Sequence, residues 1–305
     1  MTDTAKPTPC SDQSLARNDP MFGTAGAGMR WLMLELAGPW GHSAFLQSPS
    51  VIDPQLGRSI VRRAEAAGMR IAAIRRPGRR SSEPRWRWYV AHSQIGQEAL
   101  YHGEVGDPSE YLDIVLDGSE GQPTSQPLVA VCAHGKHDQC CAVRGRGVAS
   151  AIAAEYPELT WECSHLGGDR FAATMLVLPE GLCYGRADST DPARLVQLYH
   201  EGRLDNALLR GRTSVLHAAQ AAQYFARQAS GIDQIGAYAP LSVESQDGIT
   251  DVVLKNGQGS LRVVVRDEMS DPLLSQCSAT LPGPVRTFTL VSIDANSSPG
   301  TPGRQ

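Results

Sequence analysis

The residues of this chain that could do chemistry concentrate in the segment CAHGKHDQCC, residues 132–141. This segment contains three thiols and two imidazoles. A second segment, WECSHLGGDRFAATMLVLPEGLCYGR, follows at residues 161–186. Thiolates, imidazoles and carboxylates together ligate zinc or iron, so the two segments indicate a metal centre. The candidate ligands are Cys132, Cys141, Cys163, His165 and Asp169.

The spacing of these residues leaves the kind of metal open. Cys132 ends a predicted buried strand, and Cys141 lies across a polar loop in a C-x8-C pattern, which is wider than the tight pairs of structural zinc sites. His165 and Asp169 are spaced H-x3-D, which on a helical turn places both side chains on one face. Thiolates combined with imidazoles also occur in Rieske-type iron–sulfur centres. Zinc and an iron–sulfur cluster therefore both remain candidates.

Composition places the chain among globular proteins and excludes some classes. With 305 residues, 41% of them hydrophobic, the chain is long enough for two domains. A net charge of −4 gives no indication of nucleic-acid binding. No apolar run reaches the ~18–20 residues that span a bilayer, and the first residues lack the apolar core of a secretory signal. We therefore expect a cytoplasmic protein, in which clustered cysteines are metal ligands or catalytic groups rather than disulfides.

The pattern of strands, helices and linkers predicts an α/β fold in five parts. Residues 1–20 are expected to be a disordered tail. Residues 21–122 form an N-terminal α/β domain, and residues 123–240 form a second, small α/β domain after a turn-rich linker. Residues 241–293 are a β-rich C-terminal segment with an Asn-Gly turn. Residues 294–305 are expected to be a second disordered tail, and no internal repeat is evident.

Local signals define several elements within these parts. An aspartate followed by proline, which caps and starts a helix, occurs at Asp53-Pro54 and again at Asp191-Pro192. Residues 31–36 form an apolar run that predicts a buried strand. The basic runs RRPGRR and LRGR are interpreted as solvated loops.

Several motifs resemble those of the sucrase/ferredoxin-like family of thioredoxin-like [2Fe-2S] proteins. The segments CAHGKHDQCC, SHLGGDRFA and LPEGLCYGR closely resemble its cluster motifs. MFGTA, LMLELAGPWG and YHEGRLDNALLRGRTS resemble further signatures, so the resemblance extends from about Met21 to Val291. It implies a thioredoxin-like iron–sulfur domain, preceded by a second domain that could share this fold. It also implies a [2Fe-2S] cluster held by two cysteines and by two histidines in an H-x3-H motif.

Carried over to this chain, the resemblance implies Cys132, Cys141 and His165 as cluster ligands. Asp169 stands where the family has its second histidine, so the fourth ligand is open between this carboxylate and a cysteine. Cys163 precedes His165 by two residues, which in a strand directs both side chains the same way.

The remaining cysteines and histidines receive other interpretations. Cys140 would need a cramped turn to join the ligand set beside its neighbour. Cys183 is interpreted as a small buried strand residue, and Cys10 and Cys277 are assigned no metal role. The two histidines between the cluster cysteines are interpreted as solvated loop residues, with a hydrogen bond to the centre as the alternative. They are His134 and His137.

The function predicted from these features is that of an electron carrier between a reductase and an acceptor protein, without substrate turnover of its own. A zinc-bound or metal-free thioredoxin-like binding module is the alternative, and a homodimer is an open question. No C-x-x-C motif supports a thiol oxidoreductase, and no carboxylate pair supports a sucrase. Three arginines near the motifs are either surface charges or a docking site for an acidic redox partner. They are Arg144, Arg146 and Arg170.

Overall fold

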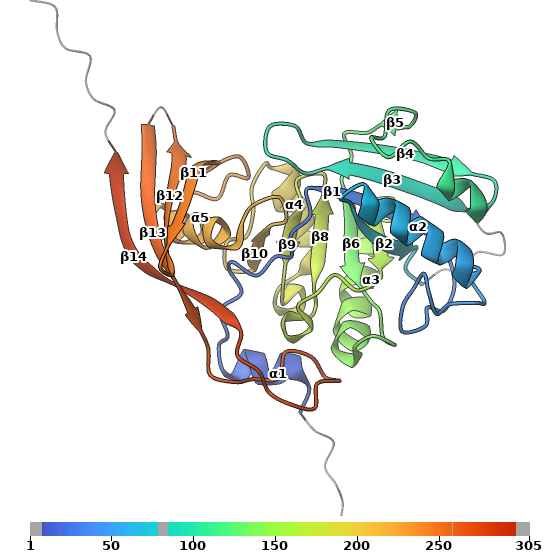
Figure 1. Ribbon diagram of the computed structural model, residues 1–305, viewed down its shortest axis with the longest axis horizontal. Coiled ribbons are helices and arrows are strands. Elements are labelled where there is room, and N and C mark those ends of the chain that lie inside the picture. Colours follow the sequence, from blue (N-terminus) through green and yellow to red (C-terminus); the bar gives the residue numbers. More distant parts are fainter. Residues whose placement is uncertain (1–7, 79–84, 258, 297–305) are drawn as a thin grey trace, which may run out of the picture.

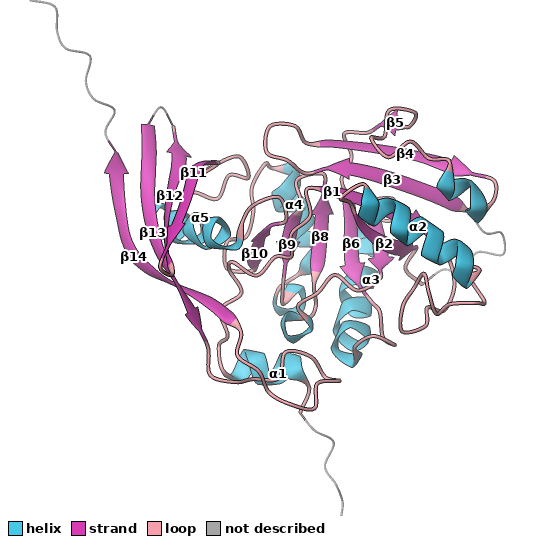
Figure 2. Cartoon of the chain, viewed as in Figure 1, coloured by secondary structure: helices cyan, strands magenta, loops and turns pink. Residues whose placement is uncertain are grey.

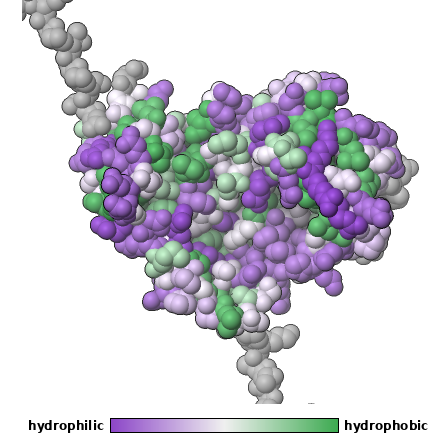
Figure 3. Space-filling view, viewed as in Figure 1, coloured by the Kyte–Doolittle hydropathy of each residue, from purple (hydrophilic) through white to green (hydrophobic). Residues whose placement is uncertain are grey.

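The computed structural model describes residues 8–78, 85–257 and 259–296. Its strands form a ten-stranded mixed sheet and a four-stranded antiparallel sheet, with helices packed on both (Figures 1 and 2). This architecture confirms the predicted α/β class. Polar side chains cover much of the face shown in Figure 3, with apolar side chains in scattered groups. Among the helices of the described residues, none combines the length and apolar character needed to cross a bilayer.

The N-terminal half builds one arm of the large sheet. Asp53 caps α2, because its carboxylate accepts hydrogen bonds from the backbone N–H groups of Gln55 and Leu56, as the Asp-Pro signal predicts. Apolar residues of α2, including Ile60, pack on β1, whose Leu32 and Leu34 are fully buried. The elements of this half are β1 (Arg30–Glu35), α2 (Pro54–Ala66), β2 (Arg70–Arg75), β3 (Trp86–His92), β4 (Ala99–Val105), η1 (Pro108–Leu112) and β5 (Gln122–Pro123).

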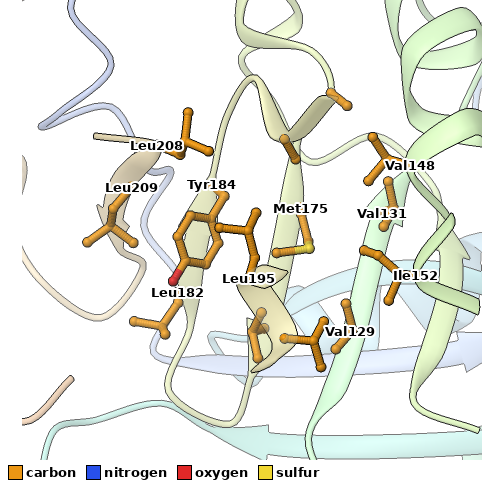
Figure 4. Packing of buried hydrophobic residues seen from close by; sticks show 14 of the residues in the cluster. Val129, Val131, Val148, Ile152, Met175, Leu182, Tyr184, Leu195, Leu208 and Leu209 are labelled. Atoms are coloured by element: carbon orange, nitrogen blue, oxygen red, sulfur yellow. The ribbon is translucent and has the colours of Figure 1, made fainter. Parts of the chain in front are cut away.

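The second half builds the other arm and carries the predicted metal ligands. Val148 and Ile152 of its first helix point toward Val131 on the neighbouring strand, within a buried apolar core (Figure 4). Its first elements are β6 (Leu128–Cys132), η2 (Cys141–Gly145), α3 (Arg146–Glu155), β7 (Thr160–Cys163), η3 (Asp169–Phe171) and β8 (Met175–Leu178). They are followed by β9 (Leu182–Tyr184), η4 (Ala187–Ser189), α4 (Pro192–His200), β10 (Leu209–Arg212) and α5 (His217–Ser230).

The two halves share one strand arrangement. The large sheet has the order β10-β9-β8-β6-β7-β2-β1-β3-β4-β5. In each half the first two strands are parallel, a helix connects them, and the third and fourth strands follow antiparallel on the other side of the first. The structure therefore contains a repeat of strand arrangement, which the sequence, with no evident internal repeat, did not indicate.

One continuous sheet connects the two predicted domains. β2 pairs with β7 in antiparallel fashion through Ile74 with Cys163 and Arg75 with Glu162. A buried cluster on one face includes Met33 of the first half together with residues of the second. The predicted boundary between residues 122 and 123 cuts β5, and the sheet runs on across both predicted parts.

The predicted β-rich segment is the second sheet, which packs on α5 through buried apolar residues such as Ala222, Val263 and Phe288. Its last strand pairs up to Asn296, so the disordered tail predicted from residue 294 is wrong for 294–296. Residues 297–305 lie outside the described residues. The strands of this sheet are β11 (Pro240–Gln246), β12 (Ile249–Asn256), β13 (Gly259–Met269) and β14 (Arg286–Asn296).

The N-terminal tail is ordered where the sequence predicts disorder. Residues 10–16 form helix α1 (Cys10–Ala16), which lies beside the connection between β13 and β14 (Figure 1). Polar anchors hold it: Arg186 donates hydrogen bonds to the backbone carbonyl and hydroxyl of Ser14, and Arg144 donates one to the hydroxyl of Ser11. The composition of residues 1–20 does not reveal these contacts with distant residues, so it predicted disorder. Residues 1–7 lie outside the described residues.

The basic run LRGR is a buried strand rather than a solvated loop. It forms β10 at the edge of the sheet, and its two arginine side chains have partners. Arg212 forms an ion pair with Glu98 at 2.6 Å, and Arg210 donates a hydrogen bond to the carbonyl of Gly167. In the run RRPGRR, Arg75 belongs to β2, while its last two arginines lie outside the described residues.

Gly145 provides a test of how the second half is assembled. A Cβ atom at this position would lie 1.9 Å from the carbonyl oxygen of Cys132, whereas one at Gly147 would meet nothing within 4 Å. We expect Gly145→Ala to lower the free energy of unfolding by about 1–3 kcal/mol through overpacking. Gly147→Ala in the adjoining helix should raise it by about 0.5–1 kcal/mol. Denaturant unfolding of both variants measures this; equal effects would contradict the packing described.

Candidate metal centre

The predicted ligands come from the ends of two parallel strands. Cys132 is the last residue of β6, and Cys141 begins the π-helical turn η2 after the intervening loop. His165 lies two residues beyond the end of β7, and Asp169 begins η3. The close approach of Gly145 to the carbonyl of Cys132 brings η2 against the end of β6, and with it the two thiols.

These four side chains converge in the structure. The Sγ atoms of Cys132 and Cys141 and a ring nitrogen of His165 all lie within 4.8 Å of one another. Oδ1 of Asp169 is 3.3 Å from Sγ of Cys141 and 3.1 Å from Nδ1 of His165. Both cysteines are 1% exposed, whereas the His165 side chain is 26% exposed. The buried cluster could hold a metal, with the imidazole on its outer side.

A glycine turn, and not the predicted helical turn, brings Asp169 back to His165. Gly167 and Gly168 have φ angles of +90° and +83°, a region that side chains disfavour. The guanidinium of Arg210 donates to the carbonyl of Gly167 at 2.8 Å and holds this turn from the neighbouring strand. No pattern in the sequence indicates this role of Arg210, since an arginine in a basic run resembles a surface residue.

Cys163 occupies a different position from the four converging side chains. It is the last residue of β7, fully buried beside Cys132 in the sheet register, and burial raises the pKa of its thiol. Among the described residues, no group of mutually close ligand atoms includes it. The geometry therefore favours Asp169 over Cys163 as the neighbour of His165. Cys183 is buried in β9 as predicted.

Opposite charges organise the metal-free centre. The hydrogen bond from Cys141 lowers the pKa of Cys132 against the effect of burial, and His165 lowers it further. Burial opposes charge on both His165 and Asp169, but their mutual attraction outweighs it. The pKa of Asp169 is lowered, and that of His165 rises to about 9, with Cys132 contributing. A thiolate, an imidazolium and a carboxylate thus lie together where a cation would bind.

His134 is buried, so its interpretation as a solvated histidine is wrong. One ring nitrogen lies 2.6 Å from the carbonyl of Gly41, and the other accepts a hydrogen bond from the backbone N–H of His165 at 3.3 Å. The ring is therefore neutral, with its proton on Nε2, and burial lowers its pKa. His137 is half-buried and stacks on His165 with ring centroids 3.8 Å apart.

The three arginines near the motifs have separate roles. Arg144 forms ion pairs with Asp12 and Asp188, and Arg170 is buried near Asp19. Arg146 lines a groove of about 1630 Å³ that also contains Ala133, His134 and Lys136 from the ligand loop. Six basic and three acidic residues line this groove. They are Arg75, Arg76, Arg85, Arg87, Lys136 and Arg146, against Glu35, Glu158 and Glu162.

Comparison with known proteins identifies a family. The family model described as Sucrase/ferredoxin-like matches residues 21–211, which is well over half of the chain and includes all four converging side chains. The resemblance predicted from the motifs is confirmed over this range, whereas its predicted extension toward Val291 lies beyond the match. Neither the curated proteins nor the solved structures give a significant match.

The ion pair between His165 and Asp169 predicts a pH dependence for the metal-free, reduced chain. The pKa of His165 rises from 6.5 to about 9, so its contribution to stability is complete below pH 6.5 and is lost as the pH rises toward 9. Asp169, with its lowered pKa, loses its contribution only as the pH falls below its ordinary value of 3.8. Between pH 6.5 and 9 we expect a loss of up to about 3 kcal/mol in the free energy of unfolding.

Urea unfolding at several pH values measures this dependence. His165→Gln removes the titrating group and should flatten the stability profile between pH 6.5 and 9. If wild type and this variant lose stability in parallel, the proposed coupling is wrong.

Proposed function

The chain belongs to the sucrase/ferredoxin-like family, and on that premise we propose that it binds one [2Fe-2S] cluster and relays single electrons between a reductase and an acceptor protein in the cytoplasm. The ligands are Cys132, Cys141, His165 and Asp169. The observation that carries the proposal is the convergence of two buried thiols with a carboxylate and a partly exposed imidazole. The protein acts as a carrier rather than as an enzyme.

The chemistry of the four side chains fits such a cluster. Nδ1 of His165 is buried beside Asp169 at 3.1 Å, and once it releases its proton its lone pair can bind a metal, so metal binding there is coupled to proton loss. Two thiols and an imidazole suit iron–sulfur or zinc chemistry and do not suit the hard cations, which prefer oxygen. The wide C-x8-C spacing and the family favour the cluster over zinc.

The position of each ligand suggests how electrons reach the centre. When bound, a [2Fe-2S] cluster supplies one-electron transfer. Both cysteines are shielded from solvent, so the edge formed by His165 and the stacked His137 is the shortest route from the surface. His134 fixes the backbone of His165 and so limits rearrangement when the charge changes.

The basic groove beside the ligand loop supports docking of an acidic redox partner. Its excess of basic over acidic side chains would attract a negatively charged surface and accelerate encounter at low ionic strength. Lys136 and His134 belong to both the groove and the ligand loop, which brings a docked protein close to the cluster. The centre contains a single carboxylate, Asp169, which is buried, whereas glycoside hydrolysis needs a pair of carboxylates, so the centre does not support a sucrase.

Anaerobic purification followed by iron and sulfide analysis tests the cluster. We expect two irons and two acid-labile sulfides per chain, with an electron paramagnetic resonance signal that appears on dithionite reduction. Cys132→Ser or Cys141→Ser should abolish the visible absorption, because serine oxygen is a poor substitute for a thiolate. Cys183→Ser, at a buried cysteine outside the centre, is the matched control and should retain it. Stoichiometric zinc without sulfide in wild type would support the binding-module alternative instead.

The fourth ligand can be identified from the reduction potential. If Asp169 is a ligand, Asp169→His replaces an anion by a neutral imidazole and should raise the potential and alter the spectrum. The wild-type potential should lie between that of this variant and the value of about −400 mV for all-cysteine plant-type ferredoxins. Cys163→Ser should leave both potential and spectrum close to wild type. Protein-film voltammetry of wild type and the two variants measures the potentials. A potential that changes only in Cys163→Ser would identify Cys163 as the fourth ligand.

A further inference from the structure

A second group of cysteines gathers next to the centre and involves none of its four proposed ligands. Cys10 comes from α1, Cys140 from the start of the turn that carries Cys141, and Cys277 from the connection between β13 and β14. Cys10 and Cys140 are buried, and Cys277 is exposed. The three segments are far apart in the sequence, so neither spacing nor motif reveals the group.

The three sulfurs form a nearly regular triangle. Their Sγ–Sγ distances are 3.7 Å for Cys10–Cys140, 3.1 Å for Cys140–Cys277 and 3.5 Å for Cys277–Cys10. A tetrahedral zinc ion with bonds of about 2.3 Å to sulfur separates its thiolate ligands by about 3.8 Å. The triangle therefore matches one face of such a site after a small expansion.

Asp138 completes the group with a carboxylate. It is 3% exposed, and one of its oxygens lies within 4.8 Å of the three sulfurs. Its Oδ1 accepts a hydrogen bond from the backbone N–H of Cys140 at 2.7 Å, and its Oδ2 accepts one from that of Cys277 at 2.8 Å. The carboxylate thus fixes the backbone at two of the three cysteines and retains lone pairs for a cation.

A metal explains this arrangement better than a disulfide does. A disulfide would join two of the sulfurs and would not explain why the third thiol lies beside them. It would also leave the carboxylate of Asp138 buried without a cation, although burying an uncompensated charge is unfavourable. Zinc binds both thiolates and carboxylates, so three thiolates and one carboxylate form an anionic ligand set that suits it.

We propose that Cys10, Cys140, Cys277 and Asp138 bind a zinc ion that fastens α1 and the connection between β13 and β14 to the ligand loop of the first centre. Each thiol that ligates loses its proton to solvent as the zinc binds, so binding is coupled to proton release. The four-coordinate site has no open position, as in structural zinc sites. The exposed side of Cys277 gives the ion access.

The test uses the full chain, expressed with zinc and purified anaerobically without chelating agents. Inductively coupled plasma mass spectrometry should find about one zinc ion per chain. Cys10→Ser and Cys277→Ser should each lower that content at least several-fold, while Cys183→Ser keeps it. Iron and sulfide are measured in the same samples. Because Cys10 and Cys277 lie outside the first centre, loss of zinc with iron retained separates this site from the cluster proposal.

Differential alkylation tests the same proposal on wild-type protein, so its result does not depend on whether the variants fold. With zinc bound, Cys277 should resist iodoacetamide despite its exposure, and removal of zinc by a chelator should make it reactive, while Cys183 is unchanged. Three results would overturn the proposal: wild type that takes up no zinc under reducing conditions, zinc that is lost in Cys132→Ser but kept in Cys277→Ser, or an intact mass that shows a disulfide among the three cysteines.

Discussion

The short junction between β2 and β7 is the contact on which the rest of the structure depends. The two strands pair only near their carboxyl ends, through Ile74 with Cys163 and Arg75 with Glu162, and the second pair is also an ion pair at 2.7 Å. Such a pairing joins two sheets into one and brings the loops that follow the first strand of each half toward the same place. The hydrogen bond between His134 and the carbonyl of Gly41 crosses between these loops.

The two halves share one topology but have different roles at the metal centre. Cys132 ends β6 and the ligand loop follows it, whereas β1 ends at Glu35 and is followed by apolar Leu36 and a loop with Trp40 and Gly41. The ring of Trp40 packs edge-on against His134 at a centroid distance of 5.6 Å. The first half therefore supplies none of the four proposed ligands. Its loop packs against His134 and shields that neutral ring from solvent, and its residues also line much of the basic groove.

The sequence alone predicted the structural features that are decided by residues close together along the chain. The caps at Asp53 and Asp191 lie where expected, and the converging ligands stand at strand ends, because local rules and strand order decide these features. It did not predict the burial of His134, whose partner is 93 residues away, or the strand formed by residues 209–212, whose arginines are paired across the fold. Helix α1 was missed for the same reason, since its polar residues are held by distant arginines.

The neighbouring cysteines Cys140 and Cys141 show how adjacent positions in the sequence can belong to two different sites. Cys141 faces the end of β6, and Cys140 faces α1 and Cys277 on the other side. Asp138 lies between the groups: it fixes the backbone of Cys140, and one of its oxygens is within 4.8 Å of Sγ of Cys141 and an oxygen of Asp169. Three protons leave as one divalent cation binds, so the filled zinc site would carry more negative charge than the same residues with neutral thiols, and it would increase repulsion toward the anionic ligands of the first centre. Helix α1 and the connection between β13 and β14 would then influence the electrostatics of the centre through one short loop, although neither segment supplies any of its proposed ligands.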